Sequence, residues 1–181
     1  ALIKPLTSAA FIGVALANGV GEGGWAAAVG VALALSWLGD VLLLWRNSAG
    51  FLAGLGAFLL AHVAFAVAFI MRGWRADVAS GAAVILAIAA FFVARWLLPR
   101  APAKMRVAVV AYMVVITAMV ALAFATAAAE PAPMIAVAAV AFFLSDIGVA
   151  MNRFITPAFW VRAWALPLYY AAQLAFAWAI V

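Results

Sequence analysis

The chain has 181 residues and a formal net charge of +5; 73% of its residues are hydrophobic and only 8% are charged. Soluble domains carry about 25% charged residues, so this composition excludes a water-soluble fold and a disordered chain, and the absence of cysteine excludes a disulfide scaffold. The apolar stretches are continuous rather than alternating, which is typical of transmembrane helices and not of transmembrane strands, so we expect an all-α, polytopic transmembrane helical bundle.

Breaks at Gly, Pro and charged clusters divide the chain into seven apolar segments. Each is predicted to form one membrane-spanning helix, because about 20 residues cross the hydrocarbon core. The short connections favour antiparallel neighbours in a single domain over residues 1–181. In chain order the predicted spans are Ile3–Ala17, Trp25–Trp45, Phe51–Met71, Val78–Leu98, Val107–Ala127, Met134–Met151 and Ala163–Val181.

The ten Lys and Arg residues indicate the orientation of the chain rather than nucleic-acid binding, because they are spread singly over short loops and form no patch. With helices that alternate in direction, eight of the ten fall on one side and two on the other. The positive-inside rule places the eight in the cytoplasm. We therefore expect an integral protein of a bacterial inner (plasma) membrane, with Lys4 on the cytoplasmic side and Val181 outside.

Two carboxylates lie inside predicted spans, Asp40 in Leu-Ser-Trp-Leu-Gly-Asp and Asp146 in Phe-Phe-Leu-Ser-Asp. A charge at the centre of a span costs about 3 kcal/mol or more, so each is a candidate functional residue. Both fall in the cytoplasmic half of the predicted topology. If they meet in a dry bundle, one can stay protonated as an acid while the other is ionised as a base. The alternative is that each only holds helices together through hydrogen bonds or a salt bridge.

His62 is the only histidine and lies near the middle of the third predicted span. It is either a satisfied interior histidine or part of a site. A catalytic zinc site uses three protein ligands, commonly several histidines, and His62 with two distant aspartates does not favour one, so no metal and no cofactor are expected. Ser36 and Ser145 precede the two aspartates but show no local signature of a nucleophile.

Three basic residues are expected near the aspartates on the cytoplasmic side. Arg46 and Arg153 follow Asp40 and Asp146 by six and seven residues, and Lys4 begins the first segment on the same side. Such residues are either interfacial anchors or ligands of a phosphate group.

The two halves of the chain echo each other. The stretch 61–68 (Ala-His-Val-Ala-Phe-Ala-Val-Ala) is similar to 172–179 (Ala-Gln-Leu-Ala-Phe-Ala-Trp-Ala), and Leu-Gly-Asp at Asp40 is similar to Leu-Ser-Asp at Asp146. The matched segments lie four spans apart and are therefore parallel. This pattern predicts a tandem duplication with a two-fold axis near the membrane normal.

Several short motifs together resemble the YhhN-like family, whose animal members are lysoplasmalogenases. They are Lys4-Pro5-Leu6, Ser36-x-x-Gly39-Asp40-x-Leu42-Leu43, Gly54 to Phe58 leading to His62, Ser145-Asp146 with Arg153-Phe154, and Tyr169-Tyr170-x-x-Gln173. The resemblance covers nearly the whole chain. Two departures are notable: family members generally have eight spans, with one before the Lys-Pro motif, and Phe65 stands where a Tyr is common.

The resemblance implies an enzyme that hydrolyses the vinyl ether bond of lysoplasmalogen, or of a related lysolipid, to a fatty aldehyde and a glycerophospho-base. Its partners would be the lysophospholipid and the bilayer, with no nucleic acid. For this reaction we predict that Asp40 and Asp146 are the acid and the base, with the division between them unassigned. The predicted residues for positioning substrate or water are His62, Tyr170, Gln173, Ser36 and Ser145, and the predicted headgroup ligands are Lys4, Arg46 and Arg153. Two other classes stay open: a small transporter or proton-coupled carrier whose aspartates are protonation sites, and a non-catalytic structural or lipid-binding bundle.

Overall fold

A computed structural model describes residues 3–45 and 47–180, with side chains from Pro5 onward. Over these ranges it contains α-helices, one short 3-10 helix and no strand, so the predicted all-α fold is confirmed. Each α-helix overlaps one of the predicted segments, and some of the helix ends differ from the predicted ends by a few residues. The elements are α1 (Ile3–Ala17), α2 (Gly24–Leu42), α3 (Ser48–Arg72), α4 (Ala76–Leu97), η1 (Leu98–Arg100), α5 (Ala103–Ala129), α6 (Pro133–Phe154) and α7 (Phe159–Trp178).

Five helices are long and apolar enough to cross a membrane, namely α2, α3, α4 continued by η1, α5 and α6. The predicted first and last spans fall short of this measure for different reasons. Helix α1 has only a short apolar stretch, Pro5–Ala17, whereas α7 has 20 residues but includes polar side chains such as Arg162 and Gln173. Both helices pack against α2 and against each other, so they belong to the same bundle.

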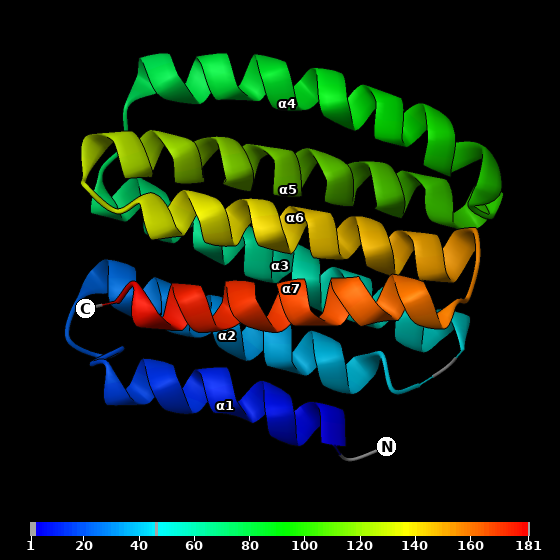
Figure 1. Cartoon of the computed structure of the whole chain (residues 1–181), viewed down its shortest axis with the longest axis horizontal. Coiled ribbons are helices and arrows are strands. Elements are labelled where there is room, and N and C mark those ends of the chain that lie inside the picture. The colour runs from blue at the N-terminus through cyan, green and yellow to red at the C-terminus, as the bar shows by residue number, and fades with distance from the viewer. Residues whose placement is uncertain (1–2, 46, 181) are drawn as a thin grey trace.

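The helices run nearly along the long axis of the molecule, and α1 and α4 lie at opposite edges (Figure 1). The most extensive packing joins α2 to α3 and α6 to α7, and α5 contacts α3, α4 and α6. Helix α4 is the most peripheral, because Leu97 is its only buried residue. The interior is therefore formed mainly by α2, α3, α5, α6 and α7.

An aromatic cluster fills the interior. The side chains of Phe65, Phe69, Phe142 and Phe176 are at most 1% exposed, and their contacting ring centroids lie 4.3 to 6.5 Å apart. The Phe142 ring also lies 4.5 Å from the His62 ring. Aromatic packing of this kind fixes side-chain orientation, so the cluster holds His62 in place.

Two glycines beside the intramembrane aspartates allow neighbouring helices to approach closely. A Cβ atom on Gly39 would lie 2.6 Å from the Phe58 ring on α3, and one on Gly148 would lie 2.5 Å from the Cβ of Ala165 on α7. Small residues at helix interfaces permit such close approach in membranes. The backbone segments that carry Asp40 and Asp146 are therefore drawn toward α3 and α7, respectively.

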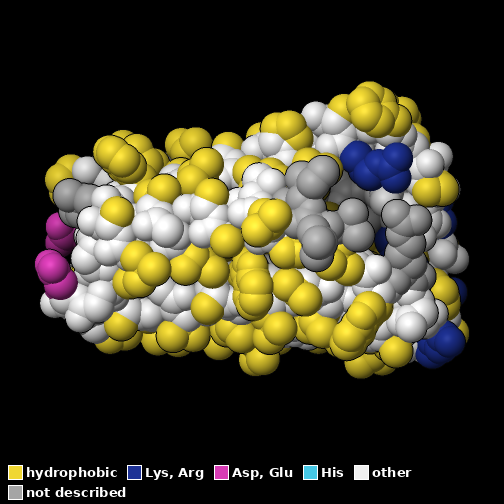
Figure 2. All heavy atoms as spheres, turned by 90° about the horizontal axis from the view of Figure 1, so that it is seen from below, with side chains coloured by type: hydrophobic (Ala, Val, Ile, Leu, Met, Phe, Trp, Pro, Cys, Tyr) yellow, Lys and Arg dark blue, Asp and Glu magenta, His cyan; other side chains and the backbone are white. Residues whose placement is uncertain are grey.

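On the surface of the bundle, basic side chains predominate at one end and acidic side chains at the other. Figure 2 shows Lys and Arg side chains gathered at one end and Asp and Glu side chains at the other. Helix α1 begins in the half nearer one end, and helix α7 finishes at the opposite end (Figure 1). At the acidic end, Arg72 donates a hydrogen bond to the carbonyl of Ala179 and lies over the Trp25 ring, which ties α3 to the C-terminal helix.

Candidate active site

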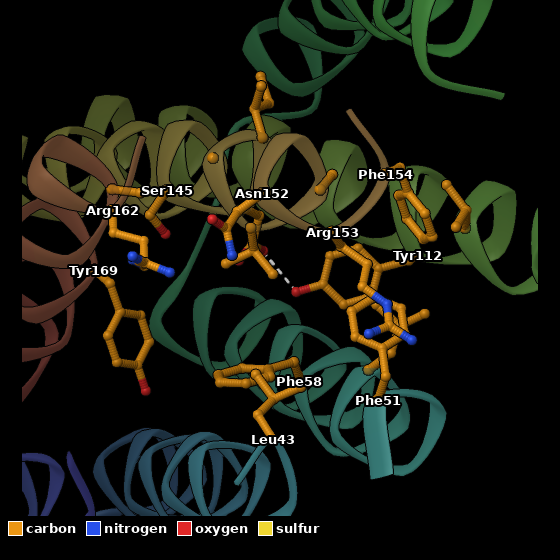
Figure 3. Close-up of a pocket in the computed structure, with 18 of the residues that line it drawn as sticks. Leu43, Phe51, Phe58, Tyr112, Ser145, Asn152, Arg153, Phe154, Arg162 and Tyr169 are labelled. Carbon is orange, nitrogen blue, oxygen red and sulfur yellow. Dashed lines mark hydrogen bonds between the residues drawn. The ribbon is translucent and has the colours of Figure 1, made fainter. Parts of the chain in front are cut away.

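A cavity of about 770 Å³ lies in the half of the bundle nearer the basic end, and both Asp40 and Asp146 line it. Its size falls within the range of roughly 300–1,000 Å³ that is usual for small-molecule sites. Figure 3 shows the labelled lining residues around the hollow, with Tyr112 from α5, Ser145 from α6 and Tyr169 from α7. The fold thus brings the two predicted carboxylates to one internal space.

Asp40 is held from two sides by hydroxyl groups. The Ser8 hydroxyl on α1 and the Tyr169 hydroxyl on α7 both donate to its Oδ2 atom, at 2.6 and 2.8 Å. The residue is only 1% exposed. It lies on the buried face of α2, one turn after the buried Ser36. Each oxygen of an ionised carboxylate can accept two hydrogen bonds, so two donors directed at one oxygen suit the ionised form.

Asp146 has a different set of neighbours. The Tyr112 hydroxyl on α5 donates to its Oδ2 atom at 2.6 Å (Figure 3), and the Nε2 atom of His62 lies 3.5 Å from the same oxygen. The Asp146 side chain is 15% exposed and the His62 side chain 1%. Asp146 is therefore the more accessible of the two carboxyl groups.

The tautomer of His62 follows from its other contact. Its Nδ1 atom lies 2.6 Å from the carbonyl oxygen of Phe58, and a carbonyl can only accept, so Nδ1 carries a proton. In the neutral ring Nε2 is then an acceptor, and it faces Asp146. A proton on Asp146 is what turns this contact into a hydrogen bond between neutral groups.

The helices that contact the two aspartates occupy equivalent positions in the two halves of the chain. Asp40 on α2 is contacted from α1 and α7, and Asp146 on α6 is contacted from α5 and α3. An exchange of the two repeats, which pairs α1 with α5, α2 with α6 and α3 with α7, converts the first set of contacts into the second. The arrangement is consistent with the predicted tandem duplication.

The predicted positioning residues divide into two groups. Ser145 lines the cavity, although its hydroxyl donates to the carbonyl of Phe142 in its own helix. His62, Tyr170, Gln173 and Ser36 are not among the described residues that line it. Ser36 donates to the carbonyl of Ala32.

Tyr170 and Gln173 follow Tyr169 in α7 by one and four residues and do not line the cavity. Gln173 is 0% exposed, and neither polar atom of its amide has a hydrogen-bond partner among the described residues. The Tyr170 hydroxyl lies 3.5 Å from that of Ser8, which bonds to Asp40. Tyr170 therefore reaches the site only through Ser8, whereas its neighbour Tyr169 contacts the carboxyl group directly.

The basic end of the cavity carries two arginines. Arg153 lies over the ring of Phe51, with 4.6 Å between the guanidinium carbon and the ring centroid. Arg153 and Arg162 both line the cavity, and Figure 3 shows them on opposite sides of it. Within the described part of the chain neither makes an ion pair or a hydrogen bond. Of the other predicted headgroup ligands, Arg46 lies outside the described residues, and of Lys4 only the backbone, in α1, is described.

Sequence reasoning missed Ser8, Tyr112, Tyr169 and Arg162 as site residues. A usable signal was the scarcity of tyrosine, because the chain has only three. Two of the three hydroxyl groups donate to an aspartate, and the third lies 3.5 Å from Ser8, which donates to Asp40. The described residues contain no group of three or more His, Cys, Asp and Glu side chains that could hold a metal ion.

Fold and site together define a helical membrane protein with paired carboxylates on an internal cavity. The profile of the YhhN family matches residues 1–180, and the chain belongs to this family, as the sequence motifs predicted. The chain is 29% identical over 152 residues to lysoplasmalogenase TMEM86A of Bos taurus, an alignment that covers 80% of this chain and 61% of that protein. The aligned region thus spans less than two thirds of this relative. No solved structure matches the chain.

Proposed function

We propose that this membrane protein hydrolyses the vinyl ether bond of lysoplasmalogen, or of a closely related single-chain ether lipid, to a fatty aldehyde and a glycerophospho-base. The observation that carries the proposal is the meeting of Asp40 and Asp146 on one cavity of about 770 Å³. The similarity to a lysoplasmalogenase supports the choice of substrate. Cleavage of a vinyl ether requires an acid that protonates carbon and a base that activates water, and a carboxyl pair can supply both.

Asp146 is the proposed acid. It is the more exposed of the two carboxyl groups, and it faces an accepting nitrogen of His62, as described above. Its proton goes to the β-carbon of the vinyl ether, which leaves an oxocarbenium ion at the α-carbon. The Tyr112 hydroxyl then stabilises the new carboxylate, because a hydrogen bond to a charged oxygen is stronger than one to a neutral oxygen.

Asp40 is the proposed base. Its position between the Ser8 and Tyr169 hydroxyl groups suits a carboxylate, and its negative charge also stabilises the nearby oxocarbenium ion. Asp40 takes a proton from water as the water oxygen adds to the α-carbon, and the product is a hemiacetal.

The protons balance when the hemiacetal collapses. Asp40 returns its proton to the leaving glycerol oxygen, while Asp146 takes the proton of the hemiacetal hydroxyl as the aldehyde forms. Both carboxyl groups end in their starting states. The cycle consumes one water and needs no further co-reactant.

The phosphate group of the substrate is proposed to bind at the basic end of the cavity. Arg153 and Arg162 offer guanidinium groups on opposite sides of it, and such groups bind phosphate through charge-assisted hydrogen bonds. The stacking of Arg153 on Phe51 holds one of these groups in place. Lys4 and Arg46 are the other phosphate ligands that the sequence predicts at this end. With the basic end in the cytoplasm, as the sequence predicts, the substrate would come from the inner leaflet.

The test is the release of aldehyde from an alkenyl lysophospholipid by the purified protein in detergent. We expect Asp40→Asn and Asp146→Asn each to abolish turnover while the protein stays folded. Asp77→Asn is the matched control, because Asp77 lies at the other end of the bundle, exposed and paired with Arg75. The saturated alkyl analogue should not react, since it has no vinyl carbon to protonate. Full activity in both aspartate variants would refute the proposal.

A further inference from the structure

Asn152 is a polar residue of the cavity that the proposed cycle does not use. The side chains with an amide or hydroxyl group that line the cavity are Asn47, Tyr112, Ser145, Asn152 and Tyr169. The two tyrosines donate to the aspartates, Ser145 donates to a carbonyl of its own helix, and the Asn47 oxygen accepts from the backbone of Gly50. The Oδ1 atom of Asn152, by contrast, is enclosed and has no hydrogen-bond partner among the described residues. An enclosed acceptor without a donor is unfavourable, so its place on a cavity points to a ligand that supplies the donor.

The amide of Asn152 lies beside the proposed phosphate site. Asn152 stands four residues after Gly148, and residues at this spacing share one side of a helix. That side faces α7, because a Cβ atom on Gly148 would lie 2.5 Å from the Cβ of Ala165. In the view of Figure 3, Asn152 lies between Arg162 of α7 and Arg153 of α6. A lipid whose phosphate binds these arginines therefore passes the amide.

The order of groups along α6 matches the order of groups along the substrate. Asn152 and Arg153 follow Asp146 by six and seven residues, about 9 and 10 Å toward the basic end. In the lipid, C2 of the glycerol lies four bonds from the β-carbon of the vinyl ether and the phosphorus lies seven bonds from it, about 5 and 8 Å along an extended chain. A contact of about 3 Å at each end, from Asp146 to the β-carbon and from the C2 hydroxyl to Asn152, bridges the remaining separation. A lipid held by Asp146 and Arg153 thus brings its C2 hydroxyl to Asn152.

We infer that the amide of Asn152 binds the free hydroxyl group at C2 of the substrate's glycerol and so selects lysolipids over lipids with a second chain; this inference rests on the proposed function. A hydroxyl group can donate to an amide oxygen and accept from an amide nitrogen, so it satisfies Asn152 in either orientation of the amide. An ester at C2 has no proton to donate. It leaves Oδ1 unpaired and places an acyl chain against the amide, which opposes binding. Asn152 is therefore a specificity-determining residue and takes no part in proton transfer.

The first test measures selectivity rather than rate. It compares lysoplasmalogen with its 2-deoxy analogue, which has hydrogen in place of the C2 hydroxyl. We expect the wild-type protein to favour the hydroxylated substrate about tenfold in kcat/KM, and Asn152→Ala to use both equally. Val149→Ala is the control, because it shortens another side chain of α6 that lines the cavity, and it should keep the wild-type ratio. A general loss of activity lowers both values and not their ratio, so an unchanged ratio in Asn152→Ala would overturn the inference.

The second test does not depend on turnover. Two saturated alkyl ether lysophospholipids, with and without the C2 hydroxyl, compete with a fluorescent lysophospholipid for the purified protein in detergent. We expect the wild-type protein to bind the hydroxylated lipid about tenfold more tightly, and Asn152→Ala to bind the two lipids equally. Equal binding of both lipids by the wild-type protein would overturn the inference. Absence of aldehyde release from every vinyl ether would refute the proposed function alone, since the binding ratio would still identify the hydroxyl site.

Discussion

Replacing Tyr112 by phenylalanine removes one hydroxyl group and keeps the ring that packs against His62 at 5.2 Å between centroids. The lost group donates to Oδ2 of Asp146 at 2.6 Å. In the proposed cycle Asp146 is neutral before proton transfer and charged after it, so this hydrogen bond gains strength on the way to the transition state. A hydrogen bond contributes about 1.5–3 kcal/mol when one group is charged and about 0.5–1.5 kcal/mol when both are neutral. Only the difference, about 1–1.5 kcal/mol, is lost from the barrier, which corresponds to a fall in kcat of roughly 5- to 10-fold.

The assay is steady-state aldehyde release, with kcat and KM determined separately. We expect Tyr112→Phe to lower kcat and to leave KM nearly unchanged, because the hydroxyl acts on the acid and not on the bound lipid. Tyr170→Phe is the matched control, since its hydroxyl lies 3.5 Å from Ser8 and contacts neither aspartate directly. A wild-type kcat in Tyr112→Phe would refute the assignment of Asp146 as the acid that Tyr112 assists.

Two further predictions concern packing and headgroup binding. Gly39→Ala places a Cβ atom 2.6 Å from the Phe58 ring, so it should lower the free energy of unfolding by about 1–3 kcal/mol. Gly56→Ala is the control, because its Cβ atom meets nothing within 4 Å, and it should change the free energy of unfolding little. Equal thermal unfolding of the two variants would contradict the close packing of α2 on α3. Arg153→Ala should raise KM more than it lowers kcat, because it removes an electrostatic contact with the phosphate. For the same reason KM should depend less on the salt concentration. An unchanged KM would mean that the phosphate binds elsewhere.

The helix interfaces suggest why the site lies where it does. Gly39 and Gly148 permit close contacts of α2 with α3 and of α6 with α7, while the larger side chains of Phe51 and Phe58 line the cavity between these pairs. Tight packing on both sides of a hollow keeps the carboxyl groups at fixed positions. Such preorganisation is what acid–base catalysis requires.

The sequence by itself determined the fold class, the helix order and the separation of charge between the two ends. Composition, apolar segment length and the position of Lys and Arg are local properties, and a bilayer converts them directly into spans and orientation. The sequence also singled out Asp40 and Asp146, because a carboxyl group inside an apolar segment is costly enough to need a reason.

Only the tertiary structure decided which groups meet these carboxylates. Tyr169 and Asp40 are 129 residues apart, and Tyr112 and Asp146 are 34 apart; no periodicity within one helix encodes such contacts. The motif Tyr169-Tyr170 shows the difference, since neighbouring residues on a helix point about 100° apart and only the packing of α7 against α2 selects the first of them. The cavity likewise arises from the spacing between helices, which is set by side chains on several segments at once.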